Sequence, residues 1–132
     1  MRSPAEILSE AHIIALVGAS PNPGRPSNSV MRYLHGVGYR VIPVRPLVRE
    51  VLGVPCVASL AEIDEPIDLV DVFRRAEFCP GVAEEAVAAR AGALWLQLGI
   101  VSPEARAIAG AAGLDYVENE CTAIVHGALR TA

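Results

Sequence analysis

The chain has 132 residues, the length of one ordinary domain, so we expect residues 1–132 to form a single domain. Apolar residues make up 52% of the sequence and charged residues 20%, which predicts an ordered protein with a well-filled core. The net charge of −4 argues against a general nucleic-acid-binding protein, because such proteins present a basic surface to the phosphate backbone.

The cysteines and the N-terminus indicate the compartment. Cys56, Cys79 and Cys121 form an odd set with no CxxC pair, which is typical of reduced thiols in a cytosol and supports neither a disulfide framework nor a zinc site. The N-terminal residues lack an apolar signal core, and the apolar runs elsewhere are shorter than a membrane span. We therefore expect a cytoplasmic protein without membrane attachment.

The first part of the chain predicts a helix, a strand, a loop, a helix and a second strand. Ser3 and Glu6 have the spacing of a capping box, which indicates a short N-terminal helix. The continuous apolar run at residues 13–17 predicts a parallel strand that is covered on both faces. A helix capped by Ser27 follows, and residues 39–44 predict the next strand.

The rest of the chain continues this alternation. Residues 54–57 suggest a short edge strand, and Ser59 with Glu62 predicts a brief helix. The later elements are expected at residues 67–73 (strand), 82–87 (helix), 93–98 (strand), 103–113 (helix) and 114–117 (strand). Strands that alternate with helices predict a doubly wound α/β fold, in which a mostly parallel sheet lies between two helical layers.

The loop after the first strand is the leading candidate for a binding site. Ligands of open parallel sheets bind where loops leave the carboxyl ends of the strands, and here that loop reads GASPNPGRPS, residues 18–27. Its small residues would let backbone N–H groups approach a phosphate, at the positive end of the following helix. The alternative is that its prolines and glycines only stiffen a long turn. It lacks the GxxxxGK[ST] of a Walker loop, and Ser20 replaces the second glycine of GxGxxG.

The ends of the later strands supply further candidates. A protein that binds NAD usually places Asp or Glu after the second strand, whereas this chain has Arg45, with Arg49 nearby. These arginines suit a phosphate on the ribose, as in NADP or coenzyme A, although both are also typical surface charges. Residues 73–75, FRR, suit an adenine face or a diphosphate, and residues 97–99, QLG, follow the next strand.

Taken together, the segments GASPNPGRPS, YRVIPVRP, DLVDVFRR and WLQLGIV resemble the family of small CoA-binding proteins, whose domain is similar to the CoA-binding domain of the succinyl-CoA synthetase alpha subunit. The resemblance implies a Rossmann-like fold with coenzyme A across the carboxyl ends of the strands. It implies that residues 18–21 hold the diphosphate, that Arg45 and Arg49 lie near the 3′-phosphate, and that residues 73–75 lie near the nucleotide. The candidate cofactor-binding residues are Gly18, Ala19, Ser20, Pro21, Arg25, Pro26, Ser27, Arg45, Arg49, Phe73, Arg74, Arg75, Gln97, Leu98 and Gly99.

The chain also departs from the family pattern. The family often has asparagine at the position of Arg45, and it commonly follows the last strand with a basic residue, where this chain is acidic. Cys121 either packs as a small core residue or forms a mixed disulfide with the CoA thiol.

No catalytic constellation is evident in the sequence. His12, His35 and His126 have no acid, base or nucleophile partner at motif spacing. We therefore expect non-catalytic binding of coenzyme A or an acyl-CoA, without a metal ion. The alternatives are an NADP-binding redox sensor or enzyme subunit, and an interaction module that has lost its ligand. The sequence is compatible with a homo-oligomer or with a protein partner.

Overall fold

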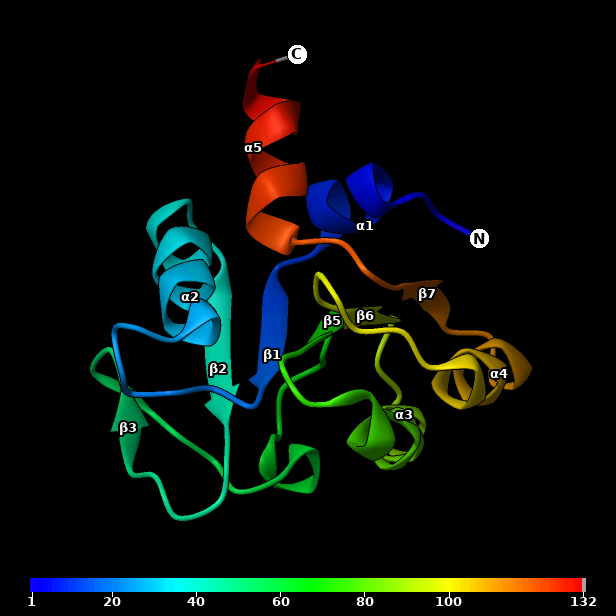
Figure 1. Ribbon diagram of the computed structural model, residues 1–132, viewed down its shortest axis with the longest axis horizontal. Coiled ribbons are helices and arrows are strands. Elements are labelled where there is room, and N and C mark those ends of the chain that lie inside the picture. The colour runs from blue at the N-terminus through cyan, green and yellow to red at the C-terminus, as the bar shows by residue number, and fades with distance from the viewer. Residues whose placement is uncertain (132) are drawn as a thin grey trace.

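A parallel sheet of five strands forms the centre of the computed structural model, which describes residues 1–131 (Figure 1). The strand order is β2-β1-β5-β6-β7, and each neighbouring pair is parallel. The strands are β1 (Ile13–Val17), β2 (Arg40–Val44), β5 (Leu69–Val72), β6 (Ala93–Leu96) and β7 (Asp115–Val117). This order confirms the predicted Rossmann-like, doubly wound sheet.

The strand order reverses between β1 and β5. From β1 the chain passes to β2 on one side, and after β2 it returns to build β5, β6 and β7 on the other side. The register aligns Val17 with Val44 on β2 and with Val72 on β5, so the three strands end together. A crevice at the carboxyl ends of the strands is expected at such a reversal, and it is where ligands of open α/β sheets bind.

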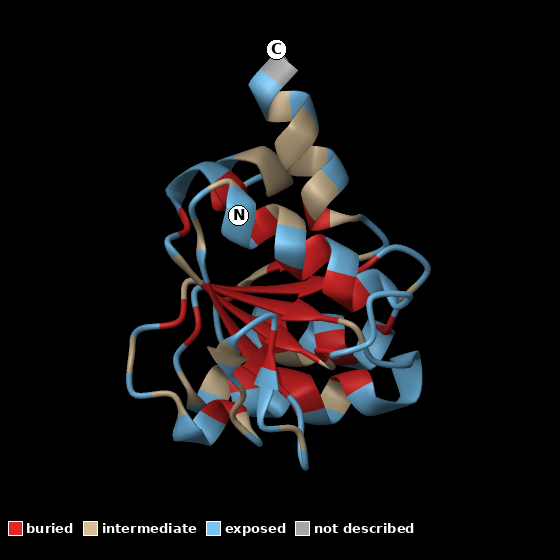
Figure 2. Ribbon diagram, turned by 90° about the vertical axis from the view of Figure 1, so that its left-hand side faces the viewer, coloured by how far each residue is buried: buried red, intermediate tan, exposed pale blue. Residues whose placement is uncertain are grey.

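Helices cover both faces of the sheet, as the predicted three layers require. On one face lie α1 (Pro4–Glu10), α2 (Pro26–Gly36) and α5 (Thr122–Thr131), and on the other lie α3 (Cys79–Ala88) and α4 (Pro103–Ala111). Figure 2 shows the buried strands between helices whose outer faces are exposed. The strands are short apolar runs because both of their faces are covered in this way.

The starts of α1 and α4 follow the capping signals in the sequence, whereas the start of α2 does not. The Ser3 side chain accepts a hydrogen bond from the Glu6 N–H, and the Ser102 side chain caps α4. The prediction that Ser27 caps α2 is wrong. Arg25 is the capping residue, and helix α2 begins at Pro26, because proline fits the first helical position, where no N–H is needed.

The predicted edge strand at residues 54–57 is not part of the main sheet. Its first residues form β4 (Val54–Pro55), which pairs in antiparallel fashion with β3 (Glu50–Val51). Val57 contacts the main sheet through an isolated bridge to Val44. The predicted brief helix is the 3₁₀ turn η1 (Leu60–Glu62), and a second such turn, η2 (Ala76–Phe78), precedes α3.

The last helix, α5, is absent from the elements predicted from the sequence. It packs through Val125 and Leu129 against the core that α1 and α2 share. Its signal is the apolar spacing at residues 124, 125, 128 and 129, which is typical of an amphipathic helix. No helix within residues 1–131 is long and apolar enough to cross a membrane.

Candidate functional site

A cavity of about 920 Å³ opens at the carboxyl ends of β2, β1, β5 and β6, beside the strand reversal. Its lining includes most of the candidate residues from the sequence, namely Gly18, Ser20, Arg25, Pro26, Ser27, Arg45, Phe73, Arg74, Arg75, Gln97 and Leu98. Cys121, for which the sequence left a contact with the CoA thiol open, also lines the cavity. The lining residues that the sequence did not single out are Val17, Val30, Val44, Pro46, Ala58, Ser59, Leu60, Phe78, Val82, Glu85, Ile100 and Ile124.

Gly18 joins the ends of three strands at the cavity. Its φ angle is +86°, and a Cβ at this position would lie 2.4 Å from the carbonyl oxygen of Phe73, which follows β5. Its N–H donates a hydrogen bond of 2.9 Å to the carbonyl of Val44 at the end of β2. Only glycine combines this backbone conformation with so close an approach.

The backbone amides of the loop are already bonded within the protein. The Gly18 and Ala19 N–H groups donate to the Val44 carbonyl, at 2.9 and 3.4 Å. The Ser20 N–H donates to Ser27 Oγ at 3.1 Å, and the Asn22 N–H donates to Ser20 Oγ at 3.1 Å. This geometry differs from the expectation that the amides of residues 18–21 hold a diphosphate, because these donors stabilise the fold of the loop itself.

The donors that remain lie at the start of α2 and on two serine side chains. The hydroxyls of Ser20 and Ser27 each accept one backbone N–H, so each keeps its own hydrogen to donate. Both serines are buried and line the cavity. The Ser27 N–H lies in the first turn of α2, where N–H groups have no partner within the helix. These groups and the positive end of α2 favour an anion beside the loop.

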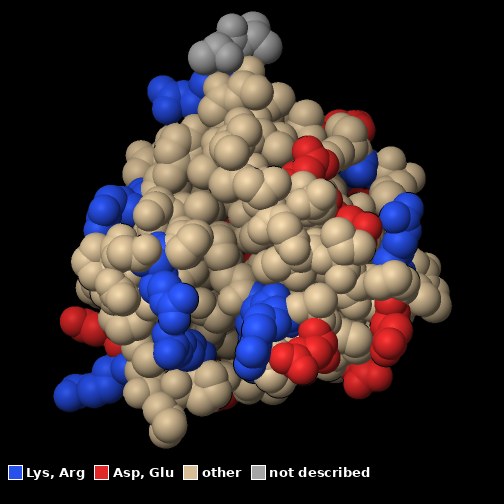
Figure 3. Space-filling model, in the orientation of Figure 1, with Lys and Arg blue, Asp and Glu red and all other residues tan. Residues whose placement is uncertain are grey.

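Three of the arginines at the cavity carry charges that no acidic side chain neutralises. Arg25, Arg45 and Arg74 have no carboxylate within 4.0 Å in the part of the chain that the structure describes. Arg75, by contrast, lies 3.4 Å from Glu77. Figure 3 shows arginine side chains around a hollow on the lower part of this face, whereas acidic groups lie mostly to the right. The cavity therefore attracts anions, although the net charge of the chain is −4.

The aromatic partner of the arginines differs from the sequence expectation. The Arg74 guanidinium lies 4.1 Å from the centre of the Phe78 ring, and that of Arg75 lies 5.6 Å from it. Phe73 instead packs against the core on the side of α2. Phe78 is the last residue of η2, just beyond the FRR segment at residues 73–75, so the sequence pattern did not include it.

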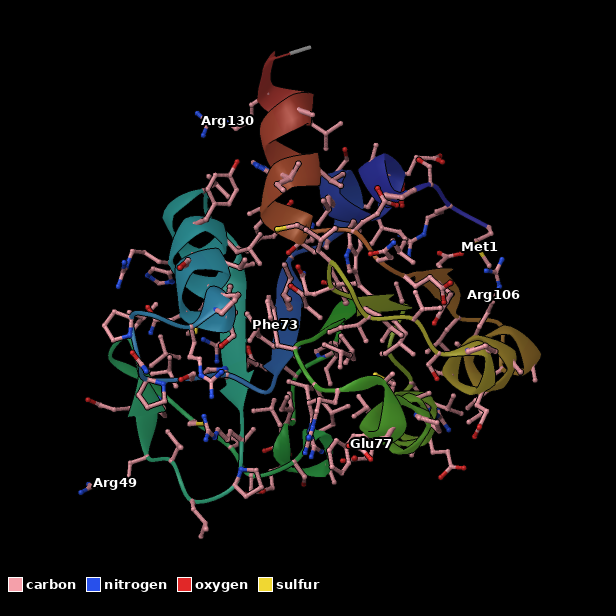
Figure 4. All side chains as sticks on the ribbon, viewed as in Figure 1. Met1, Arg49, Phe73, Glu77, Arg106 and Arg130 are labelled. Atoms are coloured by element: carbon pink, nitrogen blue, oxygen red, sulfur yellow. The ribbon has the colours of Figure 1, made fainter. Side chains whose placement is uncertain are left out.

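Four candidate residues lie outside the cavity lining. Arg49 is exposed and points away from the molecule at its lower left (Figure 4). Pro21 and Gly99 are exposed, and Ala19 is fully buried. Their positions give no support to a contact with a ligand in the cavity.

A buried polar network lies under the cavity floor, and the sequence reasoning did not find it. Asp71 is in the middle strand β5 and has no exposed surface. Gln97 Nε2 donates to Asp71 Oδ1 at 2.5 Å, and the Thr122 hydroxyl donates to Asp71 Oδ2 at 2.9 Å. Burial raises the pKa of Asp71 to about 7, although these hydrogen bonds act in the opposite direction. The sequence did contain a signal for this network, namely the carboxylate of Asp71 inside the apolar run of a predicted strand, residues 67–73.

The three histidines lie outside the lining of this cavity. His12, His35 and His126 are absent from its lining, and His126 Nδ1 lies 2.8 Å from the hydroxyl of Tyr33. Within the described residues, no cluster of His, Cys, Asp or Glu has the arrangement of a metal site.

Comparison with known proteins identifies the family. The model of a family described as CoA binding domain matches residues 12–127. The chain belongs to this CoA-binding domain family. It is 44% identical to the uncharacterized protein YneT of Bacillus subtilis, over 92% of the chain and 90% of that protein. A solved structure of a hypothetical protein from Pyrococcus horikoshii OT3 matches with a TM-score of 0.93 and 40% identity. This match covers 96% of the chain described here and 89% of the Pyrococcus chain.

The same domain type occurs inside larger enzymes. An ADP-forming acetate–CoA ligase of Archaeoglobus fulgidus is 37% identical over 55% of the chain, and the match spans 11% of that enzyme. The chain thus corresponds to a small portion of the ligase, and the matched segment lies in the CoA-binding domain type that the family defines.

We predict that Gly18→Ala lowers the free energy of unfolding by roughly 2–5 kcal/mol, because the added Cβ is strained at positive φ and meets the Phe73 carbonyl. Gly113→Ala is the matched control, since Gly113 has a φ of +80° but no neighbouring atom within 4 Å of the position that a Cβ would occupy. Urea denaturation of both variants measures the difference. An equal loss in the two variants would show that the close approach to Phe73 contributes nothing.

We predict that Asp71 makes stability fall as pH rises from about 4 to about 7. An unfolded chain releases this proton near pH 3.8, whereas the native state keeps it to about pH 7, so the stabilisation is complete at low pH and is lost across this window. The wild-type free energy of unfolding minus that of Asp71→Asn should therefore decrease over the window, by about 2–4 kcal/mol.

Urea denaturation at a series of pH values measures this difference, and Asp115→Asn serves as the control. Burial raises the pKa of Asp115, but the hydrogen bonds from Arg2 outweigh it and leave that pKa below its usual value of 3.8. The corresponding difference for Asp115→Asn should therefore be flat above about pH 4. A flat difference for Asp71→Asn as well would contradict the assignment.

Proposed function

We propose that the chain binds coenzyme A or an acyl-CoA in the cavity at the strand reversal, as a binding protein rather than as an enzyme. The observation that carries the proposal is that arginines without a carboxylate partner converge from three separate segments on one cavity. Guanidinium groups whose charge no carboxylate neutralises favour a ligand with several phosphate groups. The volume of about 920 Å³ lies within the range of sites for cofactor-sized ligands.

The charged end of the cavity fits the nucleotide part of coenzyme A. Arg25 and the donors of Ser20 and Ser27 suit the diphosphate, since they lie at the positive end of α2. Arg45 follows β2 and suits the 3′-phosphate of the ribose. Arg74, whose guanidinium lies on the Phe78 ring, suits the rest of the nucleotide. Side chains and the first turn of α2, rather than the loop amides, supply the donors in this arrangement.

The other end of the cavity fits the uncharged arm of coenzyme A. Leu98, Ile100, Cys121 and Ile124 line it, and none of these side chains carries a charge. Leu98 and Ile124 are 64% and 66% exposed, which leaves apolar surface for the arm or for an acyl group to cover. A polyanionic head joined to an apolar arm matches the two ends of one cavity.

Family membership supports the same ligand. The chain belongs to a family described as a CoA binding domain, and a relative that matches over part of its length is an acetate–CoA ligase.

Isothermal titration of the purified protein with coenzyme A tests the proposal. We expect saturable binding, and we expect Arg25→Ala, Arg45→Ala and Arg74→Ala each to weaken it by about 1–3 kcal/mol, because each removes a charge-assisted contact. Arg90→Ala is the matched control, since Arg90 is exposed, lies outside the cavity lining and changes the net charge equally. It should leave the affinity unchanged.

Two results would contradict the proposal. The first is no heat of binding and no rise in melting temperature with coenzyme A at millimolar concentration, since ligand at a hundredfold its Kd should add about 2.7 kcal/mol. The second is an NADP affinity that exceeds that of coenzyme A in a competition titration, which would assign the cavity to a nicotinamide nucleotide instead.

A further inference from the structure

Gln97 brings a polar side chain to the apolar end of the cavity. It follows β6, lines the cavity together with Leu98 and Ile100, and is 3% exposed. Cys121, just before α5, and Ile124, in the first turn of α5, line the same cavity and are uncharged. In apolar surroundings, an amide group needs hydrogen-bond partners, because burying it without them is costly.

The buried network fixes which end of the Gln97 amide faces inward. Gln97 Nε2 donates to Asp71 Oδ1 at 2.5 Å and to Thr122 Oγ1 at 2.9 Å. The Thr122 hydroxyl gives its hydrogen to Asp71 Oδ2 at 2.9 Å, so Thr122 can only accept from Gln97. A reversed amide would set Oε1 against a carboxylate oxygen and against a hydroxyl with no hydrogen left to give. The three side chains therefore allow one orientation.

Protonation of Asp71 does not remove this constraint. A proton on Oδ2 would be donated to Thr122 Oγ1, and Oδ1 would still accept from Gln97 Nε2. With a proton on Oδ1 and the amide reversed, only that proton and the Thr122 hydroxyl hydrogen would serve the three contacts of the network, so one contact would join two acceptors. The inward direction of the amide nitrogen thus holds in both states of the carboxyl group.

The Gln97 amide oxygen, Oε1, has no hydrogen-bond partner among the described residues and faces the cavity. No hydrogen bond from a described residue reaches Gln97 Oε1, and no buried side-chain nitrogen or oxygen within the described residues lacks a partner. Oε1 is therefore open to the space that Gln97 lines, which is the cavity. The apolar end of the cavity presents a hydrogen-bond acceptor whose direction the protein has fixed.

We propose that Asp71 and Thr122 hold Gln97 so that its Oε1 accepts a hydrogen bond from an amide N–H in the pantetheine arm of coenzyme A. This inference rests on the proposed function and adds a selection rule to it. An acceptor that is held in place raises the affinity for a ligand with a hydrogen-bond donor at that point. It lowers the affinity for a ligand that has a carbonyl group or no polar group there. Gln97 contacts the ligand, and Asp71 is a positioning residue that acts through it.

The position of Gln97 suits this part of the ligand. β6 lies two strands from β1, which is a lateral distance of about 10 Å. That is the span of about three residues of extended chain, so an arm of amide-linked units that starts at the phosphate donors of α2 can reach Gln97. A nucleotide without the arm would end before it.

Affinity measurements with two ligands test the contact. Gln97→Met keeps the length of the side chain but removes the acceptor, and we expect it to weaken coenzyme A binding about tenfold. The same variant should bind adenosine 3′,5′-diphosphate, which lacks the arm, as tightly as the wild type does. Equal losses for both ligands, or no loss for either, would overturn the inference while leaving the proposed function in place. Failure of the wild type to bind coenzyme A would overturn both.

A double-mutant cycle tests the positioning role of Asp71. Asp71→Ala should also weaken coenzyme A selectively, and the double variant Asp71→Ala/Gln97→Met should bind no more weakly than Gln97→Met alone, because Asp71 acts through Gln97. Additive losses would show that Asp71 affects the cavity by another route.

Selective isotope labelling keeps the inference falsifiable even if Asp71→Ala fails to fold. Gln97 is the single glutamine of the chain, so its side-chain amide resonances can be labelled alone. We expect its Nε2 protons to be protected from exchange with water both in the free protein and in the coenzyme A complex, with contacts to the Thr122 methyl group. Rapid exchange, or contacts from Nε2 protons to the ligand, would show that the amide faces the other way.

Discussion

The close approach of Gly18 to the carbonyl of Phe73 is the contact on which the rest of the structure depends. It requires a glycine with positive φ, and it sets the end of β1 against the end of β5. The Gly18 N–H to Val44 bond ties β2 to the same point. Because the carboxyl ends of these strands share one edge, the segments that follow them bring Arg25, Arg45 and Arg74 to one cavity, although each comes from a different part of the chain.

The loop and the cavity divide their polar groups between folding and binding. The backbone donors of residues 18–20 are bonded inside the protein, so they stiffen the loop. The unpaired groups are side chains and the first turn of α2, and they face a site that is already formed. Such preorganisation lowers the entropy that binding would otherwise cost. The Asp71 network extends the same design to the other end of the cavity, where one amide oxygen is presented in a fixed direction.

The sequence predicts what depends on local pattern, and it misses what depends on the path of the chain. Residues 13–17 indicate a central strand because the run is apolar throughout, and Arg45 is predictable as a cavity residue because it follows a parallel strand. No local pattern shows that Ser27 would accept the Ser20 N–H instead of capping α2, since that bond depends on how the loop closes. The partners of Asp71 lie 26 and 51 residues further along the chain, so only the fold reveals them.

An NMR titration of isotope-labelled protein with coenzyme A can decide where on the molecule the ligand binds. A second cavity of about 330 Å³, lined by His12, Tyr39 and His126 among others, provides an internal comparison. We expect saturable shifts of the amides at residues 18–27, 73–75 and 97–98, with the amides around the second cavity unmoved. Shifts confined to the second cavity, or none at all, would rule out binding at the strand reversal.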